Sequence, residues 1–456
     1  MATYVPLETQ LFINGKAIAE ASVDDTNAAV AAAKAAQPGW AKLSPKQRGE
    51  CFKRFATLLR QNGPELARLE ALSMGRPVKG YADNVVAAAK FDFYAEAGYN
   101  IQGQSSLNTP GFLNVTLRQP FGVVAAIIPW NVPLIAMSGK VAPALAAGNA
   151  VVLKSSEKAP LTSIKVAEYI VEAGFPPGVI NILSGHGHIS GATLGAHMDV
   201  RALSFTGSTR TGRAIQEASA RSNLKNLIFE LGGKSPAIVF DDADLDRAIP
   251  ETAHSIQWNS GQVCMANSRI YVQRSIAPRF MDGFKKHFGN VTLGDPTDPT
   301  TTYGPLADSA QVDMVSSYVS IGKESGKLEM GGEFEPKTFT FRPTVFTDTK
   351  EDAKIVKEEV FGPIVNINIF DTEEEVLGKA NDTEYGLYSA LYTQDVSRAL
   401  RFAVGLESGV VGVNCTSPQT SFDMPFGGYK TSGVGREGIR DSLDNFLEKK
   451  TVLFRM

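Results

Sequence analysis

The sequence of 456 residues contains very little cysteine. Its three cysteines, Cys51, Cys264 and Cys415, lie far apart along the chain. Thiols at this spacing exclude a disulfide framework and form no CxxC-type metal site, so we expect no metal. The chain therefore fits a reducing compartment, where each thiol is either a small hydrophobe or a nucleophile.

The sequence also lacks a long uninterrupted apolar run and a strong charge of either sign. The most apolar segment, residues 121–153, is broken by Asn131, Lys140 and three prolines, so no run in it is long enough to span a bilayer. Neither end of the chain carries a recognisable targeting signal, and we expect a cytoplasmic protein. A net charge of -3 gives no polycationic surface, which argues against nucleic acid as a partner.

What the chain does contain is a regular alternation of short apolar runs and helical stretches. The runs predict strands at residues 123–128, 149–154, 179–183, 201–205 and 226–231, with helices between them at 133–147, 161–173, 189–196 and 209–220. Strands alternating with helices indicate βαβ units, and continuous apolar runs are typical of a parallel sheet covered on both faces. The pattern predicts an α/β fold with a doubly wound, nucleotide-binding sheet.

Three other regions flank this sheet. A helical region precedes it, starting at Ser44-Pro45 and burying one face with Cys51 beside it. A second α/β series follows Gly232–Gly233. Residues 113–119 and 449–455 fit neither series, and we expect these strands to pair with each other or with a neighbouring subunit.

Three motifs place polar groups where predicted strands end. The turn FTGSTRTG (205–212) exposes backbone N–H groups at a helix N-terminus, which suits a phosphate, although an ordinary βα turn explains it equally well. Glu230 ends a strand in FELGGKSP, where it would face the crevice of an open α/β sheet or, alternatively, cap a helix or lie on the surface. Asn131 in PWNVP follows a buried strand, and turn chemistry is its alternative role. With Cys264 in WNSGQVCMANS, these motifs supply a nucleophile, a base, an oxyanion donor and a phosphate site.

Seven motifs occur in a characteristic order: PWNVP (129–133), VVLKSSE (151–157), FTGST (205–209), ELGGKSP (230–236), GQVC (261–264), EEVFGP (358–363) and PFGGYKTSGVGREG (425–438). In this order and at these intervals they resemble the aldehyde dehydrogenase superfamily over nearly the whole chain. The resemblance implies an NAD-binding domain (1–102 and 122–232), a catalytic domain (233–430) and a small oligomerisation element (103–121 and 431–456). It also implies a homodimer or homotetramer.

The resemblance implies a role for each reactive residue. Cys264 matches the nucleophile that forms a thiohemiacetal and then a thioester, with the oxyanion held by the Asn131 amide and the Cys264 backbone N–H. Glu230 matches the base that activates water, and Lys140 and Glu437 match a supporting proton relay. Because a free thiol is mostly protonated at neutral pH, the site must favour the thiolate, and we expect backbone N–H groups and the positive ring of the cofactor to do so.

The resemblance also implies which residues bind the cofactor and the aldehyde. Lys154 and Glu157 match contacts to the adenosine ribose; because a carboxylate disfavours a 2′-phosphate, we expect NAD, with NADP as the alternative. The other expected cofactor contacts are Ile128, Trp130, Gly187, Phe205, Thr206, Gly207, Ser208, Leu231, Glu359 and Phe361. The expected aldehyde pocket is apolar, which favours an aliphatic or aromatic aldehyde, and consists of Val132, Trp258, Val263, Met265 and Phe426.

Two departures and two other functions remain open. The segment 12–30 is shorter than is usual in the family, and the sequence HGH at 186–188 replaces a common Gly-Pro turn, which we interpret as a tolerated loop change. A branch of the family that transfers the acyl group to coenzyme A is one alternative, although its members typically lack the glutamate found here as Glu230. An inactive binding or structural protein on the same scaffold is the other.

Overall fold

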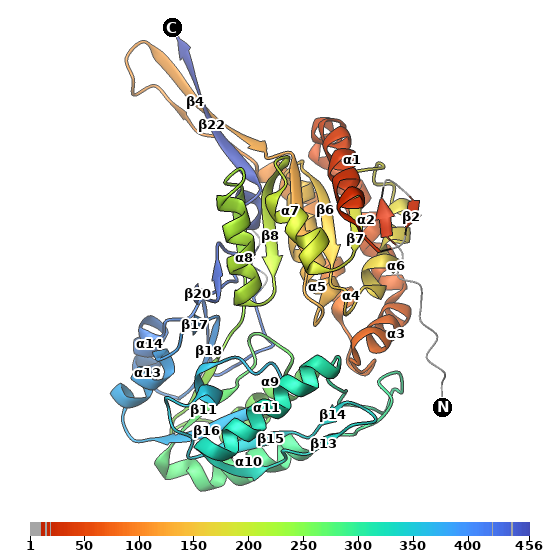
Figure 1. The fold of residues 1–456 in the computed structure, drawn as a ribbon. Helices are drawn as coiled ribbons and strands as arrows, with labels where there is room; N and C mark the ends of the chain where they lie inside the picture. The colour runs from red at the N-terminus through yellow and green to blue at the C-terminus, as the bar shows by residue number, and fades with distance from the viewer. Residues whose placement is uncertain (1–10, 14–15, 19, 422, 439–440) are drawn as a thin grey trace.

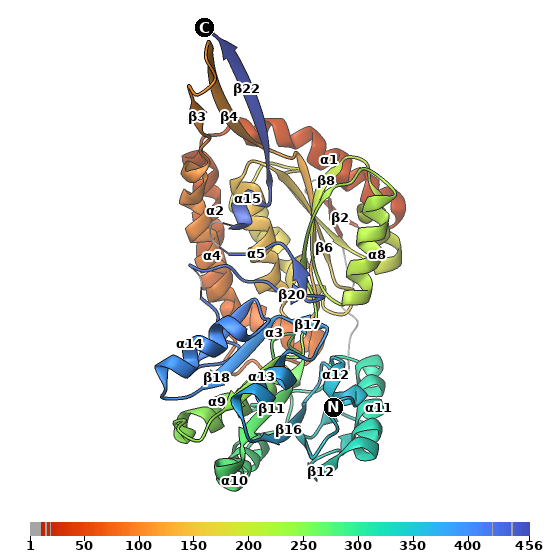
Figure 2. The same cartoon turned by 90° about the vertical axis from the view of Figure 1, so that its left-hand side faces the viewer.

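The computed structural model of the chain describes residues 11–13, 16–18, 20–421, 423–438 and 441–456. One large sheet with its helices forms the upper half of the molecule in Figures 1 and 2, and a second large sheet forms the lower half. A narrow arm of strands projects from the upper half and carries the C-terminus.

The first sheet has eight strands in the order β2-β1-β7-β6-β5-β8-β9-β21. Its five central strands are parallel and are β5 (Val123–Ile127), β6 (Ala150–Ser155), β7 (Ile180–Ser184), β8 (Val200–Thr206) and β9 (Asn226–Glu230). The chain builds outward from β5, first through β6 and β7 and then on the other side through β8 and β9. The direction of winding therefore reverses between β5 and β8, and ligands of such sheets bind at the carboxyl ends of the strands at that point.

Helices cover both faces of this sheet, as the continuous apolar runs predict. Val124 and Ala126 of β5 belong to one buried cluster, while Val123 and Ala125 belong to another. The first cluster contains residues of α2 (Pro45–Gln61), α4 (Asp83–Ala97), α5 (Pro133–Ala146) and α6 (Leu161–Glu172). The second contains residues of α1 (Val23–Lys42), α7 (Ala192–Ala196) and α8 (Thr209–Ala220).

The predicted helix start at Ser44-Pro45 is confirmed. The Ser44 hydroxyl accepts a hydrogen bond from the Gln47 backbone N–H at 3.3 Å, so α2 begins with a capped first turn. Cys51 is 6% exposed beside the buried face of α2 and its thiol donates to the Gly174 carbonyl, which agrees with a core thiol. Helix α3 (Gly63–Met74) connects α2 to the loop that precedes α4.

The abbreviated segment 12–30 still closes the edge of the first sheet. Strands β1 (Leu11–Ile13) and β2 (Lys16–Ile18) form a hairpin, and β1 pairs with β7. The Ala21 N–H donates to the Ser184 carbonyl at 2.9 Å, and Ser22 caps α1. Residues 14, 15 and 19 of this segment lie outside the described residues.

The second sheet has seven strands in the order β12-β15-β16-β11-β10-β18-β19, and β12 alone is antiparallel. Its strands are β10 (Pro236–Val239), β11 (Arg269–Gln273), β12 (Lys327–Met330), β15 (Thr344–Thr347), β16 (Ile364–Phe370), β18 (Tyr388–Tyr392) and β19 (Val410–Val413). Its helices are α9 (Leu245–Gln257), α10 (Ala277–Gly289), α11 (Ser309–Ser325), α12 (Lys354–Lys357), α13 (Glu373–Asn381) and α14 (Val396–Gly405).

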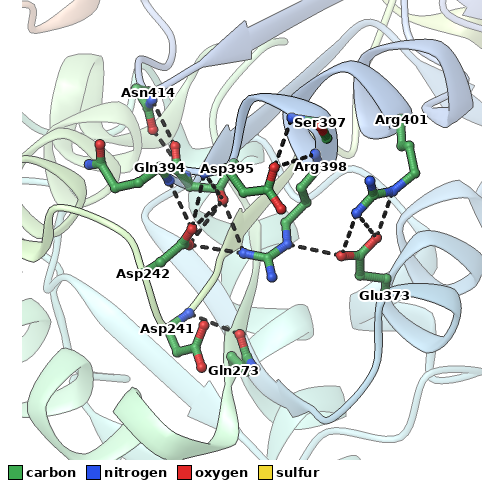
Figure 3. A network of polar contacts seen from close by, with 11 residues as sticks. Asp241, Asp242, Gln273, Glu373, Gln394, Asp395, Ser397, Arg398, Arg401 and Asn414 are labelled. Carbon is green, nitrogen blue, oxygen red and sulfur yellow. Dashed lines mark hydrogen bonds and ion pairs between the residues drawn. The ribbon is translucent and has the colours of Figure 1, made fainter.

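The carboxyl ends of the middle strands of this second sheet are joined by a polar network (Figure 3). Asp242, which follows β10, accepts hydrogen bonds from the backbone N–H groups of Gln394 and Asp395 after β18. The Arg398 guanidinium bridges Asp242 and Glu373 at 3.0 Å each. This end of the second sheet is therefore tied together by charged side chains.

The two predicted strands outside both α/β series, at residues 113–119 and 449–455, pair with each other. This is one of the two pairings that the sequence predicts. Strand β4 (Phe112–Pro120) and strand β22 (Leu447–Arg455) form an antiparallel arm from Phe112↔Arg455 to Pro120↔Leu447, with β3 (Ser105–Ser106) beside β4. Five short strands and one short helix also belong to the fold: β13 (Phe334–Glu335), β14 (Thr340–Phe341), β17 (Tyr385–Gly386), β20 (Tyr429–Lys430), β21 (Gly433–Val434) and α15 (Asp441–Asp444). Within the described part of the chain, no helix has both the length and the apolar character that crossing a membrane requires.

Candidate active site

Cys264 lies on an irregular loop between α9 and β11. Before it, the 3-10 turn Trp258–Gly261 contains Asn259 and Ser260 in the left-handed region, at φ 50 and 55. Gly261 has φ 71, and a Cβ on it would come within 2.2 Å of the Gly362 carbonyl oxygen. Only glycine permits this close approach, and the strained turn leads directly to Cys264, which is half-buried.

Asn131 is tied directly to the Cys264 loop. It is 4% exposed at the end of the connection from β5, and its Nδ2 donates to the Gln262 carbonyl at 2.9 Å. The Asn259 side chain in turn donates to the Asn131 carbonyl at 3.1 Å. A side-chain amide has two N–H groups, so the second one remains for an oxyanion near the thiol. Turn chemistry alone does not explain Asn131, because its side chain bonds to the distant Gln262 and not to its own turn.

Glu230 is the last residue of β9 and is 4% exposed, which excludes its alternative role as a surface charge. Its backbone pairs with Thr206 at the end of β8, and its carbonyl accepts from the Gly207 N–H at 3.1 Å. Among the described residues, neither carboxylate oxygen has a hydrogen-bond partner. Burial raises the pKa of Glu230 well above its ordinary value; the Glu437 charge adds to this rise, while Lys140 and Arg436 oppose it.

The predicted relay residues meet across a long sequence separation. The Lys140 ammonium on α5 lies 2.5 Å from the Glu437 carboxylate and donates to the Ser204 hydroxyl at 3.0 Å. The Glu437 backbone pairs with Phe426 through hydrogen bonds of 2.6 and 2.7 Å. Because the Glu437 charge shifts the pKa of Glu230, the two carboxyl groups form one electrostatic cluster.

The protein alone does not favour the Cys264 thiolate. Burial raises the pKa of the thiol to about 12, and the charges of Glu359 and Glu230 contribute to the rise. The backbone N–H groups of Cys264 and Met265 lower the pKa, as the sequence predicts, but they are outweighed. The thiolate is disfavoured in the protein by itself chiefly because the thiol is buried, and the two nearby carboxylates add to this. The expected contribution of the cofactor ring stays a prediction.

Lys154 and Glu157 form an ion pair at the carboxyl end of β6. Their charged groups are 2.9 Å apart, and the lysine is buried while the glutamate side chain is 40% exposed. Burial alone would raise the pKa of Glu157, but the Lys154 charge and backbone N–H groups, including that of Gly187, lower it below its ordinary value. Glu157 thus presents an ionised carboxylate beside a turn of the cofactor crevice.

Glu359 lies close to the glycines that follow β9. Its Oε1 accepts from the Gly233 N–H at 3.0 Å, and a Cβ on Gly232 would come within 2.4 Å of its Oε2. Burial raises the pKa of Glu359 to about 7, against the opposing effects of the Gly233 N–H and the Lys234 charge. Because glycine has no Cβ, the backbone at residue 232 approaches Glu359 more closely than the backbone of any other residue type could.

The rings of Phe361 and Trp130 meet edge to face, with centroids 5.3 Å apart. The Lys158 ammonium lies 5.5 Å from the centroid of the Trp130 ring, a contact that sequence reasoning missed. The remaining predicted cofactor residues cluster at the carboxyl ends of β5, β8 and β9: Ile128, Phe205, Thr206, Gly207, Ser208 and Leu231. Ser208 is the N-cap of α8, so this turn is an ordinary helix start as well as a candidate phosphate site.

The predicted pocket residues come from three separate segments of the chain. Val132 directly precedes α5, and Phe426 is held by its backbone bridge to Glu437. Val263 is 6% exposed in the core of the second sheet, and the half-buried Trp258 and Met265 pack against that core. Sequence reasoning missed Arg76, whose guanidinium lies 4.6 Å from the centroid of the Trp258 ring.

Cys415 has no contact that would make it a second nucleophile. It is half-buried rather than fully buried, and burial raises the pKa of its thiol. The nearby charge of Glu251 raises this pKa further. A thiol in these surroundings is mostly protonated, which agrees with a structural role.

The family model described as "Aldehyde dehydrogenase family" matches residues 12–452. The chain belongs to this family. It is an aldehyde dehydrogenase, and the family and the α/β fold predicted from its motifs are confirmed.

Three proteins show how similar this aldehyde dehydrogenase is to others. An aldehyde dehydrogenase of Davidiella tassiana is 42% identical over 441 residues, which cover 96% of this chain and 89% of the relative. Aldehyde dehydrogenase 2 of Saccharomyces cerevisiae, named as NAD(P)+-dependent, is 42% identical over 446 residues and covers 95% and 88%. The structure of an NAD+ complex of an aldehyde dehydrogenase from Bacillus cereus has a TM-score of 0.95 at 38% identity, and covers 99% and 97% of the two chains.

Proposed function

We propose that this enzyme oxidises an apolar aliphatic or aromatic aldehyde to its carboxylic acid, with Cys264 as nucleophile and water as final acceptor. The observation that carries the proposal is Glu230. Its buried carboxyl has no hydrogen-bond partner among the described residues, and its charge acts on the Cys264 sulfur. A buried carboxyl with a raised pKa beside a nucleophile is suited to accept a proton near neutral pH.

The crevice residues fit a nicotinamide dinucleotide. The Lys154 and Glu157 pair offers a donor and an acceptor to ribose hydroxyls, and Glu359 offers an acceptor beside backbone too close for any side chain on Gly232. The cofactor is NAD, with NADP as the alternative, because the ionised Glu157 would repel a 2′-phosphate. When bound, the cofactor supplies the oxidising power by accepting a hydride from the substrate carbon.

The chain's own residues carry the covalent steps. The Cys264 thiol first loses its proton to solvent. The sulfur then attacks the carbonyl carbon, and the oxygen takes the electron pair of the broken π bond. Asn131, through its remaining amide N–H, and the Cys264 backbone N–H hold this oxyanion. After oxidation of the carbon, a thioester joins the acyl group to Cys264.

Glu230 then removes a proton from water as the water oxygen attacks the thioester carbon. The carbon–sulfur bond breaks, the acid leaves, and the sulfur regains its electron pair. Glu230 has to release its proton before the next turnover, and the Lys140–Glu437 pair is the charged group coupled to it. This assignment makes Glu230 a base in hydrolysis and the relay pair its route of proton exchange.

Transfer of the acyl group to coenzyme A is the alternative reaction. It needs no water-activating base, so the buried Glu230 argues against it. An inactive scaffold is also disfavoured, because the reactive residues named above are all present.

NADH formation with NAD and a panel of short aliphatic, long aliphatic and aromatic aldehydes tests the proposal. We expect turnover that disappears in Cys264→Ala while NAD still stabilises that variant in a thermal-shift titration. The product should be the acid, formed without coenzyme A. Turnover that requires coenzyme A would support the acylating branch, and loss of NAD binding by the intact protein would support an inactive scaffold.

The β4–β22 arm supports a homodimer or homotetramer. Leu117, Leu453 and Phe454 on the arm are 44%, 63% and 52% exposed, and a partner subunit would cover them. Light scattering tests this assignment, and a monomer at micromolar concentration would contradict it. The cytoplasmic location and the domain boundaries stay predictions.

A further inference from the structure

Lys90 is a partly buried cation that no step of the proposed mechanism uses. It lies on α4, in the alanine-rich sequence VVAAAKF, where packing against α5 needs no charge. Its ammonium donates to the Ile135 carbonyl on α5 at 3.3 Å. Placing an ammonium between two packed helices costs free energy, so a compensating charge is expected near it.

The Glu437 charge acts on Lys90, and both groups lie beside Gly139 without forming a direct ion pair. A Cβ on Gly139 would come within 3.1 Å of Glu437 Oε2 and within 3.2 Å of Lys90 Nζ. The Lys90 ammonium and the Glu437 carboxylate, from distant parts of the chain, therefore both lie beside α5 at Gly139, which has no side chain. The other carboxylate oxygen, Oε1, lies 2.5 Å from Lys140 Nζ. Glu437 is thus bracketed by two lysines on neighbouring helices.

The charges around this cluster are few and can be named. Burial lowers the pKa of Lys90; Glu437 opposes this, Lys140 adds to it, and Asp83 opposes it. Burial raises the pKa of Glu230, Glu437 adds to the rise, and Lys140 and Arg436 oppose it. Tyr94 on α4 also faces the cluster: burial raises the pKa of its hydroxyl, Ser442 opposes this, and Glu437 and Asp441 add to it.

We propose that Lys90 is a positioning residue of the proton-transfer network, and that its charge holds the Glu437 carboxylate in place beside Lys140. Lys90 touches neither substrate nor cofactor in this proposal, and it acts on Glu230 only through Glu437. The proposal rests on the proposed function, in which Glu230 activates water. The Lys90 charge then determines at what pH the coupled carboxyl groups release their proton.

The direction of the effect follows from charge alone. The Glu437 charge raises the pKa of Glu230, so whatever changes the charge around Glu437 also acts on Glu230. Removing a nearby positive charge makes the cluster more negative and raises its affinity for a proton. The acid side of the pH profile for hydrolysis should therefore move to higher pH when Lys90 loses its charge.

The variant Lys90→Gln tests this most directly, because glutamine keeps a donor for the Ile135 carbonyl and removes only the charge. Lys90→Met removes both, and Lys90→Arg keeps the charge. The control is Lys225→Gln, which removes a buried lysine that donates to the Gly195 carbonyl at 2.5 Å, remote from the cluster.

Infrared difference titration reads the carboxyl groups without turnover. The C=O stretch of protonated carboxyls is followed against pH in the full-length protein, with Glu230→Gln and Glu437→Gln assigning the bands. We expect the midpoint in Lys90→Gln to rise by about half a pH unit or more, with the wild-type midpoint kept in Lys90→Arg and Lys225→Gln. The acid limb of kcat should move by the same amount.

Superimposable titrations of Lys90→Gln and the wild type would overturn the proposal, and so would an equal shift in Lys225→Gln. If Lys90→Gln does not fold, Lys90→Met gives the same comparison. Failure of the proposed function has a different signature: Glu230→Gln would then hydrolyse the thioester normally, whatever the infrared midpoints are.

Discussion

Replacing Glu230 by glutamine should make the protein more stable at neutral pH while it removes hydrolysis. The substitution keeps the shape of the side chain and removes its titration. In the native protein the buried carboxyl has a pKa well above the ordinary value of 4.5, because burial and the Glu437 charge disfavour its anion. The unfolded chain has no such environment, so its carboxyl titrates near the ordinary value.

The sign and the size of the effect follow from proton linkage. Between the two pKa values the native state keeps a proton that the unfolded state has released, so stability falls as the pH rises. Below the lower value both states are protonated and nothing is lost. The free energy of unfolding should fall by about 1.4 kcal/mol for each pH unit in this window. The free energy of unfolding of Glu230→Gln does not fall in this way. The stability of the variant relative to the wild type should therefore increase with pH.

A glutamine amide without partners also costs about 1–3 kcal/mol, but that cost does not change with pH. The slope of the difference is therefore the decisive quantity. For a chain of 456 residues, about 1 kcal/mol corresponds to about 1 °C in Tm. The difference in Tm between Glu230→Gln and the wild type should grow by about 1–2 °C per pH unit from pH about 5 upward.

The assay is a thermal-shift series without cofactor from acid to mildly alkaline pH. Glu157→Gln is the control of opposite sign, since its native pKa is lowered. Its carboxylate contributes stability above the unfolded-state pKa and loses that contribution as the pH falls, so the penalty of Glu157→Gln should shrink in acid. A constant Tm difference between Glu230→Gln and the wild type would refute the assignment of a raised pKa to Glu230.

Three further substitutions have separate outcomes. Asn131→Ala should lower kcat by about 10²–10³ through the loss of an oxyanion donor, and a kcat within a few-fold of the wild type would remove Asn131 from that role. Glu157→Gln should improve kcat/KM for NADP relative to NAD, and an unchanged ratio would show that another residue selects the cofactor. Arg398→Met leaves Asp242 and Glu373 without their shared partner and should lower stability by about 1–2 kcal/mol. In this last variant kcat should stay the same, because the network lies away from the thiol.

The first sheet could be predicted in detail because local signals determine it. Its five parallel strands are continuous apolar runs, and the structure places them within one residue of the predicted bounds, whereas the edge strands β1, β2 and β21 were not predicted. In a parallel sheet the carboxyl ends lie on one edge, so Asn131, Ser208 and Glu230 could be expected to gather before any contact was known. The arm strands were also recognisable, because their alternation fitted no neighbouring unit.

Contacts between distant segments could not be read from local pattern. Lys140 and Glu437 are 297 residues apart, and only the family resemblance brought them together. Lys90 carried one signal, a charge within an alanine-rich helix, but nothing nearby identified its partner. The raised pKa of the Cys264 thiol was missed for the same reason, since it depends first on burial by distant segments and then on the charges of Glu359 and Glu230.

Local pattern also does not predict that the two sheets contribute opposite edges to the site. The rule that ligands bind at carboxyl ends holds for the first sheet, yet in the second sheet Gly233, Cys264 and Glu359 all precede the strands β10, β11 and β16. The chain passes from β9 to β10 through only residues 231–235, so the end of one strand lies close to the start of the next. This short connection sets the carboxyl edge of the first sheet against the amino edge of the second. The carboxyl edge of the second sheet then faces away and is held by Asp242 and Arg398 instead of a ligand (Figure 3).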